Sequence, residues 1–475
     1  MPRIGKQAMS TSKQTPPKKK TVLVVNAGTY CDGTLAEEVL AALHGFEVVY
    51  LTDENLRPKG RKLKIKVYTY RTPSFILMDP ELPASDPTRS PIRWALTHPV
   101  RAQKVYEWVQ TVGESISDLE GRHSPQCVLL HFSLMASLMW IERNRAPGML
   151  ASVPHVLMYY DPGIPNATIP WLFDGRLKNK GFQLYNERKT SDVVLDSWNE
   201  TLSRMSLNNG VTSSDDGLRR TVCALRSVRH AICWDSAMTP PLKALIPGMT
   251  ADYVGGFVDR SNVSKSAHFR SLPEDLRAFI EQNRRERGRS VAFVAFGSVS
   301  HLNRLRNIAA SIGSELISRK YAVIFHDASP DPENLEVVME DEAKRPMFYV
   351  HRGYVSYEAI VPNVDLVTFA GSLCLQMTCL KNAIPMLMVP LTTEQHFWAK
   401  NYRHFTGVDY VTVNSCVPKA VKSLTTRRAQ VKDYLTTVKK SLVANNTRGN
   451  LRRFVVGVIE DHVDLQNKSA LRQAS

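Results

Sequence analysis

Short apolar runs alternate with amphipathic stretches of helical length along most of the chain. The runs over residues 21–26, 46–51, 127–134 and 153–160 contain hardly any internal polar residue. Runs of this kind are typical of strands that are buried on both faces of a parallel sheet, and the stretches between them are typical of crossover helices. The hydrophobic pattern therefore predicts an α/β protein assembled from βαβ units.

The alternation occurs in two series, which predicts two domains. The first series fills residues 21–258 and the second fills 273–445, whereas 259–272 lack apolar periodicity and are interpreted as a linker. Residues 1–20 are rich in Lys, Ser, Thr and Pro and are predicted to be a disordered basic tail. Helical stretches over 425–445 and from 448 to about 464 end the pattern, so residues 446–475 are assigned to a C-terminal helix and tail.

Composition places the chain among globular proteins of a reducing compartment. It has 475 residues, of which 43% are hydrophobic and 22% charged. Its seven cysteines are scattered and include no C-x-x-C pair, which favours neither a disulfide framework nor a zinc site. The basic N-terminus has no apolar signal core, and no run is long enough to cross a membrane. We therefore expect a soluble, cytoplasmic protein.

The formal net charge of +16 raises nucleic acid and anionic membranes as partners. Six of these charges lie within residues 1–20 and seven within 57–71, so the rest of the chain carries only +3. The segment 57–71 alternates basic with apolar residues, as expected for an edge strand blunted by lysines. A peripheral contact with an anionic membrane is the alternative interpretation. A nucleic-acid partner is not expected.

The strongest candidate chemistry lies within residues 349–408. Apolar runs over 364–369 and 384–389 flank a predicted helix over 373–382, and the turn between the first run and that helix contains Gly371 and Ser372. A turn at the amino end of such a helix offers free N–H groups and the positive end of the helix dipole, which suit a phosphate. The polar residues that follow the second run are expected to face the same crevice: Thr392, Thr393, Glu394 and Gln395.

A second candidate is the turn after the first strand, which contains Gly28, Thr29 and Asp32. Its G-x-x-x-x-G spacing has no following Lys, so it is not a P-loop. A plain strand-to-helix turn explains the glycines equally well. Asp32 is either a carboxylate placed for catalysis or the N-cap of a helix that we predict from Thr34.

The order of motifs in the second series resembles the donor-binding region of UDP-glycosyltransferases. The segments YVSY, PNVDLVTFAGS, AIPMLMVPLTTEQHFWA and GV follow the spacing of that family's W-x-P-Q, T-H-G-G, G-V-P and P-x-x-x-D/E-Q motifs. Residues 273–298 resemble the family's segment that ends in F-G-S, and G-T-x-x-D resembles the G-T-R-G-D turn of its sterol and glycopeptide branches. The resemblance implies a GT-B fold, in which two Rossmann-like domains face each other across a cleft and the last helix crosses back to the first domain.

The resemblance also implies roles for individual residues. It makes Asp32 the general base that takes the proton of an acceptor hydroxyl, and it places Tyr354 against the donor's nucleobase. Glu394 and Gln395 would bind the sugar. Two Gly-Ser pairs would contact the diphosphate, namely Gly297, Ser298, Gly371 and Ser372. The implied acceptor side comprises Gly28, Thr29, His131 and Asp161, although we interpret His131 as a satisfied cleft or core histidine rather than a catalytic one.

The implied partners are a UDP-sugar, which is a co-substrate rather than a cofactor, and a lipophilic small-molecule acceptor such as a sterol. No metal is implied, because the donor cleft has no D-x-D-type acidic pair and backbone donors would stabilise the leaving UDP.

The donor motif departs from the family pattern at two positions. The slot of the family's diphosphate-binding His holds Ala370, or Phe369 with a shift of one residue. The slot of the Glu that holds the ribose hydroxyls is Thr378 or Met377, and the sequence has no carboxylate between Asp365 and Glu394. An active enzyme with altered donor contacts is one interpretation. A catalytically degenerate scaffold that binds RNA or an anionic surface is the other.

Overall fold

The computed structural model describes most of the two predicted series. The described residues are 19–26, 30–54, 65–72, 99–131, 141, 153–159, 228–234, 250–255, 269–296, 303–327, 345–353, 355–390, 393–412, 416–444 and 446–474. All statements about structure below refer to these ranges.

The first sheet contains seven parallel strands, in the order β3-β2-β1-β4-β5-β6-β7. Hydrogen bonding runs outward from β1 in both directions, so the sheet has its topological switch point between β1 and β4. The strands are β1 (Thr21–Val25), β2 (Glu47–Asp53), β3 (Lys66–Tyr70), β4 (Cys127–His131), β5 (His155–Tyr159), β6 (Arg229–Ile232) and β7 (Thr250–Tyr253).

The second sheet contains five parallel strands, in the order β10-β9-β8-β11-β12, with its switch point between β8 and β11. Two parallel sheets with helices between the strands confirm the predicted α/β fold class. The strands are β8 (Ser290–Ala295), β9 (Tyr321–Asp327), β10 (Phe348–Arg352), β11 (Leu366–Phe369) and β12 (Met386–Met388).

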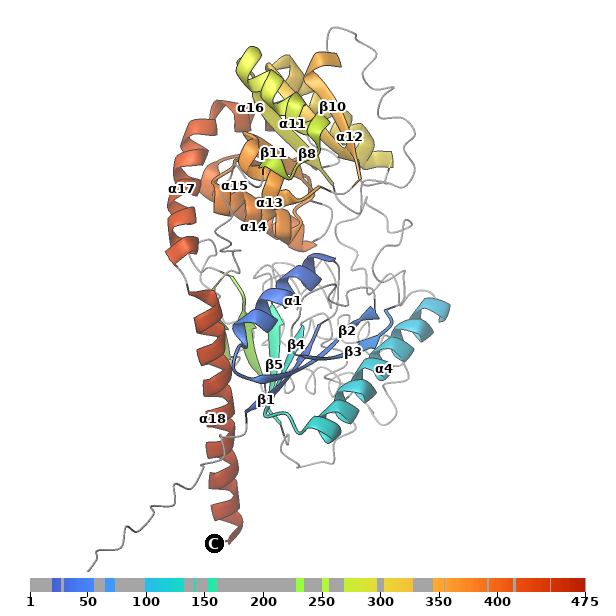
Figure 1. The fold of residues 1–475 in the computed structure, drawn as a ribbon, viewed down its shortest axis with the longest axis vertical. Helices are drawn as coiled ribbons and strands as arrows, with labels where there is room; N and C mark the ends of the chain where they lie inside the picture. The colour runs from blue at the N-terminus through green and yellow to red at the C-terminus, as the bar shows by residue number, and fades with distance from the viewer. Residues whose placement is uncertain are drawn as a thin grey trace, which may run out of the picture.

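Helices connect the strands and cover the sheets (Figure 1). We call the seven-stranded sheet with its helices the first unit and the five-stranded sheet with its helices the second unit. The helices of the first unit are α1 (Tyr30–Ala42) and α4 (Pro99–His123). The second unit contains α11 (Glu274–Glu281), which continues into a π-helical turn (Gln282–Glu286), then α12 (Asn303–Ser318), α13 (Tyr357–Ile360), α14 (Leu373–Asn382), α15 (Thr393–Thr406), α16 (Val417–Thr426) and α17 (Arg428–Ala444). The last helix is α18 (Thr447–Ala474).

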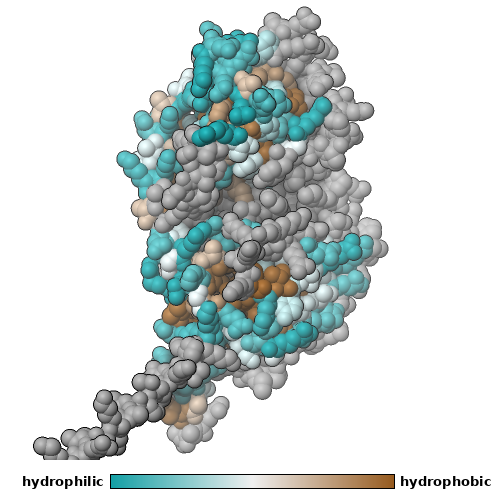
Figure 2. Space-filling model, in the orientation of Figure 1, coloured by the Kyte–Doolittle hydropathy of each residue, from teal (hydrophilic) through white to brown (hydrophobic). Residues whose placement is uncertain are grey.

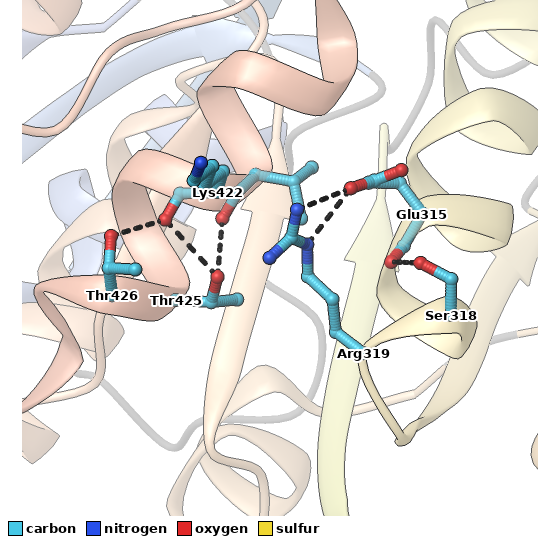
Figure 3. Close-up of polar contacts among 7 residues, drawn as sticks. Glu315, Ser318, Arg319, Lys422, Thr425 and Thr426 are labelled. Atoms are coloured by element: carbon cyan, nitrogen blue, oxygen red, sulfur yellow. Dashed lines mark hydrogen bonds and ion pairs between the residues drawn. The ribbon is translucent and has the colours of Figure 1, made fainter.

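The helix α16 is absent from the sequence predictions, and it packs against α12 (Figure 3). Directly after α12, the Arg319 side chain pairs with Glu315 of that helix, at 2.7 Å. On α16, the hydroxyls of Thr425 and Thr426 donate to main-chain carbonyls one turn back. These local bonds satisfy the threonine hydroxyls inside a helix that threonine itself does not favour.

The last helix lies against the first unit. Figure 1 shows α17 running down one side of the upper unit and α18 continuing along the lower one. The helix α18 contacts α1 and β4, and its Leu451 and Val455 are buried in the core on that face of the first sheet. The Arg448 guanidinium donates two hydrogen bonds to Glu38 Oε2 on α1, at 2.6 and 3.0 Å.

The two units also share a buried contact, which lies on the face of the first sheet opposite to the one that α18 covers. Trp234, just after β6, packs against Trp398 of α15. Among the coloured residues of the upper unit in Figure 2, hydrophilic ones predominate. None of the described helices combines the length and the apolar character that crossing a bilayer requires.

Candidate functional site

The turn between β11 and α14 has a backbone that requires glycine. Gly371 has a φ of +103°, in a region that residues with a Cβ rarely adopt. A Cβ built on Gly371 would lie 3.1 Å from Cγ and 3.2 Å from Cβ of Gln395. The missing side chain therefore allows the turn to approach Gln395 directly, and the structure brings these two predicted donor residues into contact.

Ser372 occupies the N-cap position of α14 in an extended conformation, and its side chain makes no capping hydrogen bond. The predicted helix over 373–382 is confirmed. The first N–H groups of a helix have no partner within the helix, and its dipole is positive at this end. The amino end of α14 thus offers backbone donors beside Gly371, as an anion requires.

The start of α15 lies at the same edge of the sheet. The strands β11 and β12 are parallel neighbours, with Phe369 beside Met388, so the segments that follow them emerge together. The helix α15 begins at Thr393, so Glu394 and Gln395 lie in its first turn. The Gln395 side chain is half-buried against Gly371, whereas the Glu394 side chain lies outside the described part of the structure.

A carboxylate missed by sequence analysis lies beside the position of the family's ribose-binding Glu. The Thr378 hydroxyl approaches Glu358 Oε1 at 3.3 Å, and it also donates to the Cys374 carbonyl at 2.9 Å. Lys381 Nζ donates to Glu358 Oε2 at 3.2 Å. Glu358 belongs to the short helix α13, twenty residues before Thr378. The helix α14 itself contains no acidic residue, but the carboxylate of Glu358 lies against it at Thr378.

The signal for Glu358 in the sequence was its place directly after the YVSY segment, which the resemblance assigns to the nucleobase. The carboxylate also affects its surroundings. Burial raises the pKa of the Cys379 thiol well above its ordinary value, and the negative charge of Glu358 raises it further. Cys379 is thus held as a neutral thiol and acts as a small apolar residue of the core.

In the first unit, the expected start of the first helix is wrong. The helix α1 begins at Tyr30 rather than Thr34, so Asp32 is its third residue and not its N-cap. Gly33, which the G-x-x-x-x-G spacing assigns to the turn, lies inside the first turns of the helix. A carboxylate in the first turn is compatible with the helix dipole. The Asp32 side chain, Gly28 and Thr29 lie outside the described part of the structure.

His131 is the last residue of β4 and is buried, with 4% of its surface exposed. The strand β4 pairs with β1, so His131 lies at the carboxyl edge next to the switch point of the first sheet. The remaining predicted site residues fall outside the described ranges: Gly297 and Ser298 after β8, Tyr354 after β10, and Asp161 after β5. Their places in the site stay predictions.

No family model and no curated protein matches the chain in sequence. Solved structures do match it. A UGT transferase from Siraitia grosvenorii in complex with UDP has a TM-score of 0.60 at 15% identity, covering 93% of this chain and 100% of that one. UDP-glucose:anthocyanidin 3-O-glucosyltransferase in complex with UDP has a TM-score of 0.59 at 13% identity, covering 94% and 99%. Spinosyn forosaminyltransferase has a TM-score of 0.57 at 12% identity, covering 93% and 100%.

These similarities extend over almost the whole of each chain, and their low identities make them statements about the fold. The protein has the GT-B fold of UDP-glycosyltransferases, as the motif order in the sequence implied.

Proposed function

We propose that the protein is an inverting glycosyltransferase that moves a hexose from a UDP-sugar to a hydroxyl of a lipophilic small molecule such as a sterol. The observation that carries the proposal is the approach of Gly371 to Gln395 at the amino end of α14. In a GT-B protein this edge of the second sheet is where an anionic ligand meets both a helix amino end and the polar start of the next helix. Two of the solved structures with this fold are complexes with UDP.

The donor's diphosphate would lie against Gly371 and Ser372, with Gly297 and Ser298 on its other side. Tyr354 would stack on the nucleobase, and Glu394 and Gln395 would bind the sugar hydroxyls. Glu358 would supply the carboxylate for the ribose that α14 itself lacks, because it lies against Thr378. The family's ribose carboxylate belongs to the helix that corresponds to α14, whereas here it would come from the neighbouring helix α13.

The chemistry requires one base and one stabilised leaving group. The acceptor oxygen attacks the anomeric carbon and forms the new glycosidic bond, while the bond from that carbon to the phosphate oxygen breaks. Asp32 would take the acceptor's proton, and the amino end of α14 would stabilise the charge that develops on UDP. His131, Asp161, Gly28 and Thr29 would line the acceptor side. No step in this scheme needs a metal ion.

A peripheral contact with an anionic membrane would deliver a lipophilic acceptor, and it would depend on residues 57–64. The two described cations near that segment are already paired. Lys66 Nζ lies 3.1 Å from Glu47, and Arg71 Nε lies 3.3 Å from Glu54. The strand β3 is an edge strand, so these pairs fit a blunted sheet edge.

Calorimetric titration of UDP and UDP-glucose into the purified full chain tests the proposal. We expect both to bind, and we expect Glu394→Ala to weaken UDP-glucose much more than UDP, since only the former carries the sugar. Glu460→Ala, on the exposed face of α18, is the matched control and should change neither affinity. An absence of binding at millimolar ligand would contradict the proposal and favour the noncatalytic scaffold.

A further inference from the structure

A basic groove lies at the amino edge of the second sheet, at the other end of the strands from Gly371. Its volume is about 820 Å³, and its walls include Asp365 before β11, Pro385 before β12 and one face of α17. Phosphate contacts proposed above involve the carboxyl ends of the same strands. The groove is therefore a separate place on the second unit.

The charges lining the groove are strongly unbalanced. Asp365 is the one acid among the lining residues, and it faces five cations: Arg284, Arg428, Lys432, Lys439 and Lys440. Asn382 and Thr436 add neutral polar groups. A concave surface with an excess of one charge concentrates the potential and attracts ligands of the opposite charge.

The two arginines are held in place by the acid. Arg284 donates to Asp365 Oδ2 at 3.0 Å and Arg428 donates to Asp365 Oδ1 at 2.7 Å. Arg428 also donates to Ser290 Oγ at 2.8 Å. A guanidinium has five N–H donors, so these bonds fix each head group and leave further donors for a ligand. The two arginine side chains are thus already ordered before a ligand binds, which lowers the entropic cost of binding.

The lysines belong to one flank of α17. Residues 428, 432, 436, 439 and 440 follow helical spacing on one face, while Val431, Leu435, Val438 and Leu442 form the buried face beside it. Within the described part of the chain, no hydrogen bond or ion pair joins the ammonium group of Lys432 or of Lys440 to another side chain. Both residues are exposed. These two charges are consequently available to a ligand.

Two features of the groove oppose an anion. The carboxylate of Asp365 does so, and so does the carboxyl end of α14 at Asn382, where the helix dipole is negative. Asp365 is shared between two guanidinium groups, so its charge is balanced within the groove. The main-chain N–H groups of Ala383 and Ile384 already donate to the carbonyls of Leu380 and Cys379 in the last turn of that helix. The net balance in the groove stays positive.

We propose that this groove is a binding site for a compact polyphosphate anion, separate from the donor site. Lys432 and Lys440 are eight residues apart on α17, or roughly 12 Å along the helix axis. Together with the arginine pair at one end, they would contact several phosphoryl groups at once. A single small anion would reach only part of this row, which is why the proposed ligand carries more than one phosphoryl group.

Titration of inorganic tripolyphosphate into the full chain, at about 0.15 M salt, tests the site. We expect binding that persists when the donor site is saturated with UDP. The double variant Lys432→Gln/Lys440→Gln should weaken tripolyphosphate by about tenfold or more while leaving UDP affinity unchanged. The matched control is Lys419→Gln/Lys422→Gln on α16, which removes the same charge from exposed positions outside the groove.

Three outcomes would overturn the site. If UDP displaces tripolyphosphate, the probe occupies the donor site. If both double variants weaken binding equally, the effect is general electrostatic attraction and not a groove. If tripolyphosphate does not bind, the groove has no such function. None of these results depends on whether the chain transfers a sugar, so the site fails or stands independently of the proposed function.

Discussion

Trp234 and Trp398 pack against each other with their ring centroids 4.6 Å apart and their planes tilted by 41°, and each is only 1% exposed. Trp234 follows β6 of the first sheet, and Trp398 lies on α15, one turn after Gln395. The pair therefore joins the first unit to the helix that begins at the candidate donor site. A movement of one unit relative to the other would therefore displace α15 or break its contact with Trp234.

This contact predicts energetic coupling between the units. Trp234→Leu and Trp398→Leu should each destabilise the protein by roughly 2–4 kcal/mol, because large side chains are lost from a packed interior. The double variant should cost less than the sum of the two by about 0.5–1.5 kcal/mol, the usual worth of an aromatic pair. Denaturant unfolding of the four proteins measures the coupling. A cycle that pairs Trp398 with Trp108, a core residue of α4, should be additive.

The turn at Gly371 predicts a specific loss of donor binding. Gly371→Ala introduces both a strained φ and a Cβ 3.1 Å from Gln395 Cγ, so UDP affinity should fall at least tenfold and stability by roughly 1–2 kcal/mol. Calorimetry with UDP and thermal unfolding measure the two effects. The control is Gly288→Ala, because Gly288 precedes β8 at the opposite edge of the sheet and has a positive φ of +59° with nothing within 4 Å of the added Cβ. Equal effects of the two substitutions on UDP binding would refute a role for the approach to Gln395.

The position of Glu358 predicts its contribution to ribose recognition. Glu358→Gln should weaken UDP binding by about ten- to a hundredfold, which corresponds to loss of a charged hydrogen bond worth roughly 1.5–3 kcal/mol. The same substitution should have little effect on 2′,3′-dideoxy-UDP, which lacks the hydroxyls. Thr378→Val separates the two partners of this contact, since it removes a hydroxyl and keeps the carboxylate. If Glu358→Gln weakens UDP and its dideoxy analogue equally, the residue acts on the fold and not on the ribose.

The buried Tyr402 predicts a pH-dependent stability of the second unit. Burial raises the pKa of Tyr402 above its ordinary value of 10, while its hydroxyl oxygen accepts a hydrogen bond from the Met386 main chain at 3.0 Å. A raised pKa in the folded state gives a stabilisation that is complete below pH 10 and is lost as the pH rises further. Tyr402→Phe should cost about 1–3 kcal/mol at pH 7, because it leaves the buried Met386 N–H without an acceptor. This difference from the wild type should shrink above pH 10, and a difference that grows with pH would exclude the explanation.

Much of the fold follows from local sequence pattern. The helix over 373–382 and the apolar strands before and after it were predicted because crossover helices and doubly buried strands have distinct periods and lengths. Helix boundaries were less accurate. The pattern gave no start at Tyr30, because Gly33 suggested a turn that the packed helix overrides. The interpretation also missed α16, although its buried residues Val417, Ala420, Val421 and Leu424 have helical spacing and Pro418 is compatible with a first turn.

The βαβ alternation, the glycine turn before α14 and the order of motifs that implied a GT-B fold could all be predicted, since each depends on residues close together in the chain. Which distant groups meet depends on how the chain folds. Glu358 reaches Thr378 from a neighbouring helix, and Arg284 and Arg428 share Asp365 although they lie 81 and 63 residues away from it. Burial and charge act through space, and strand order and helix packing fix those distances. A carboxylate missing from one motif can therefore be present in the folded site, and a basic groove can form from cations that are scattered along the chain.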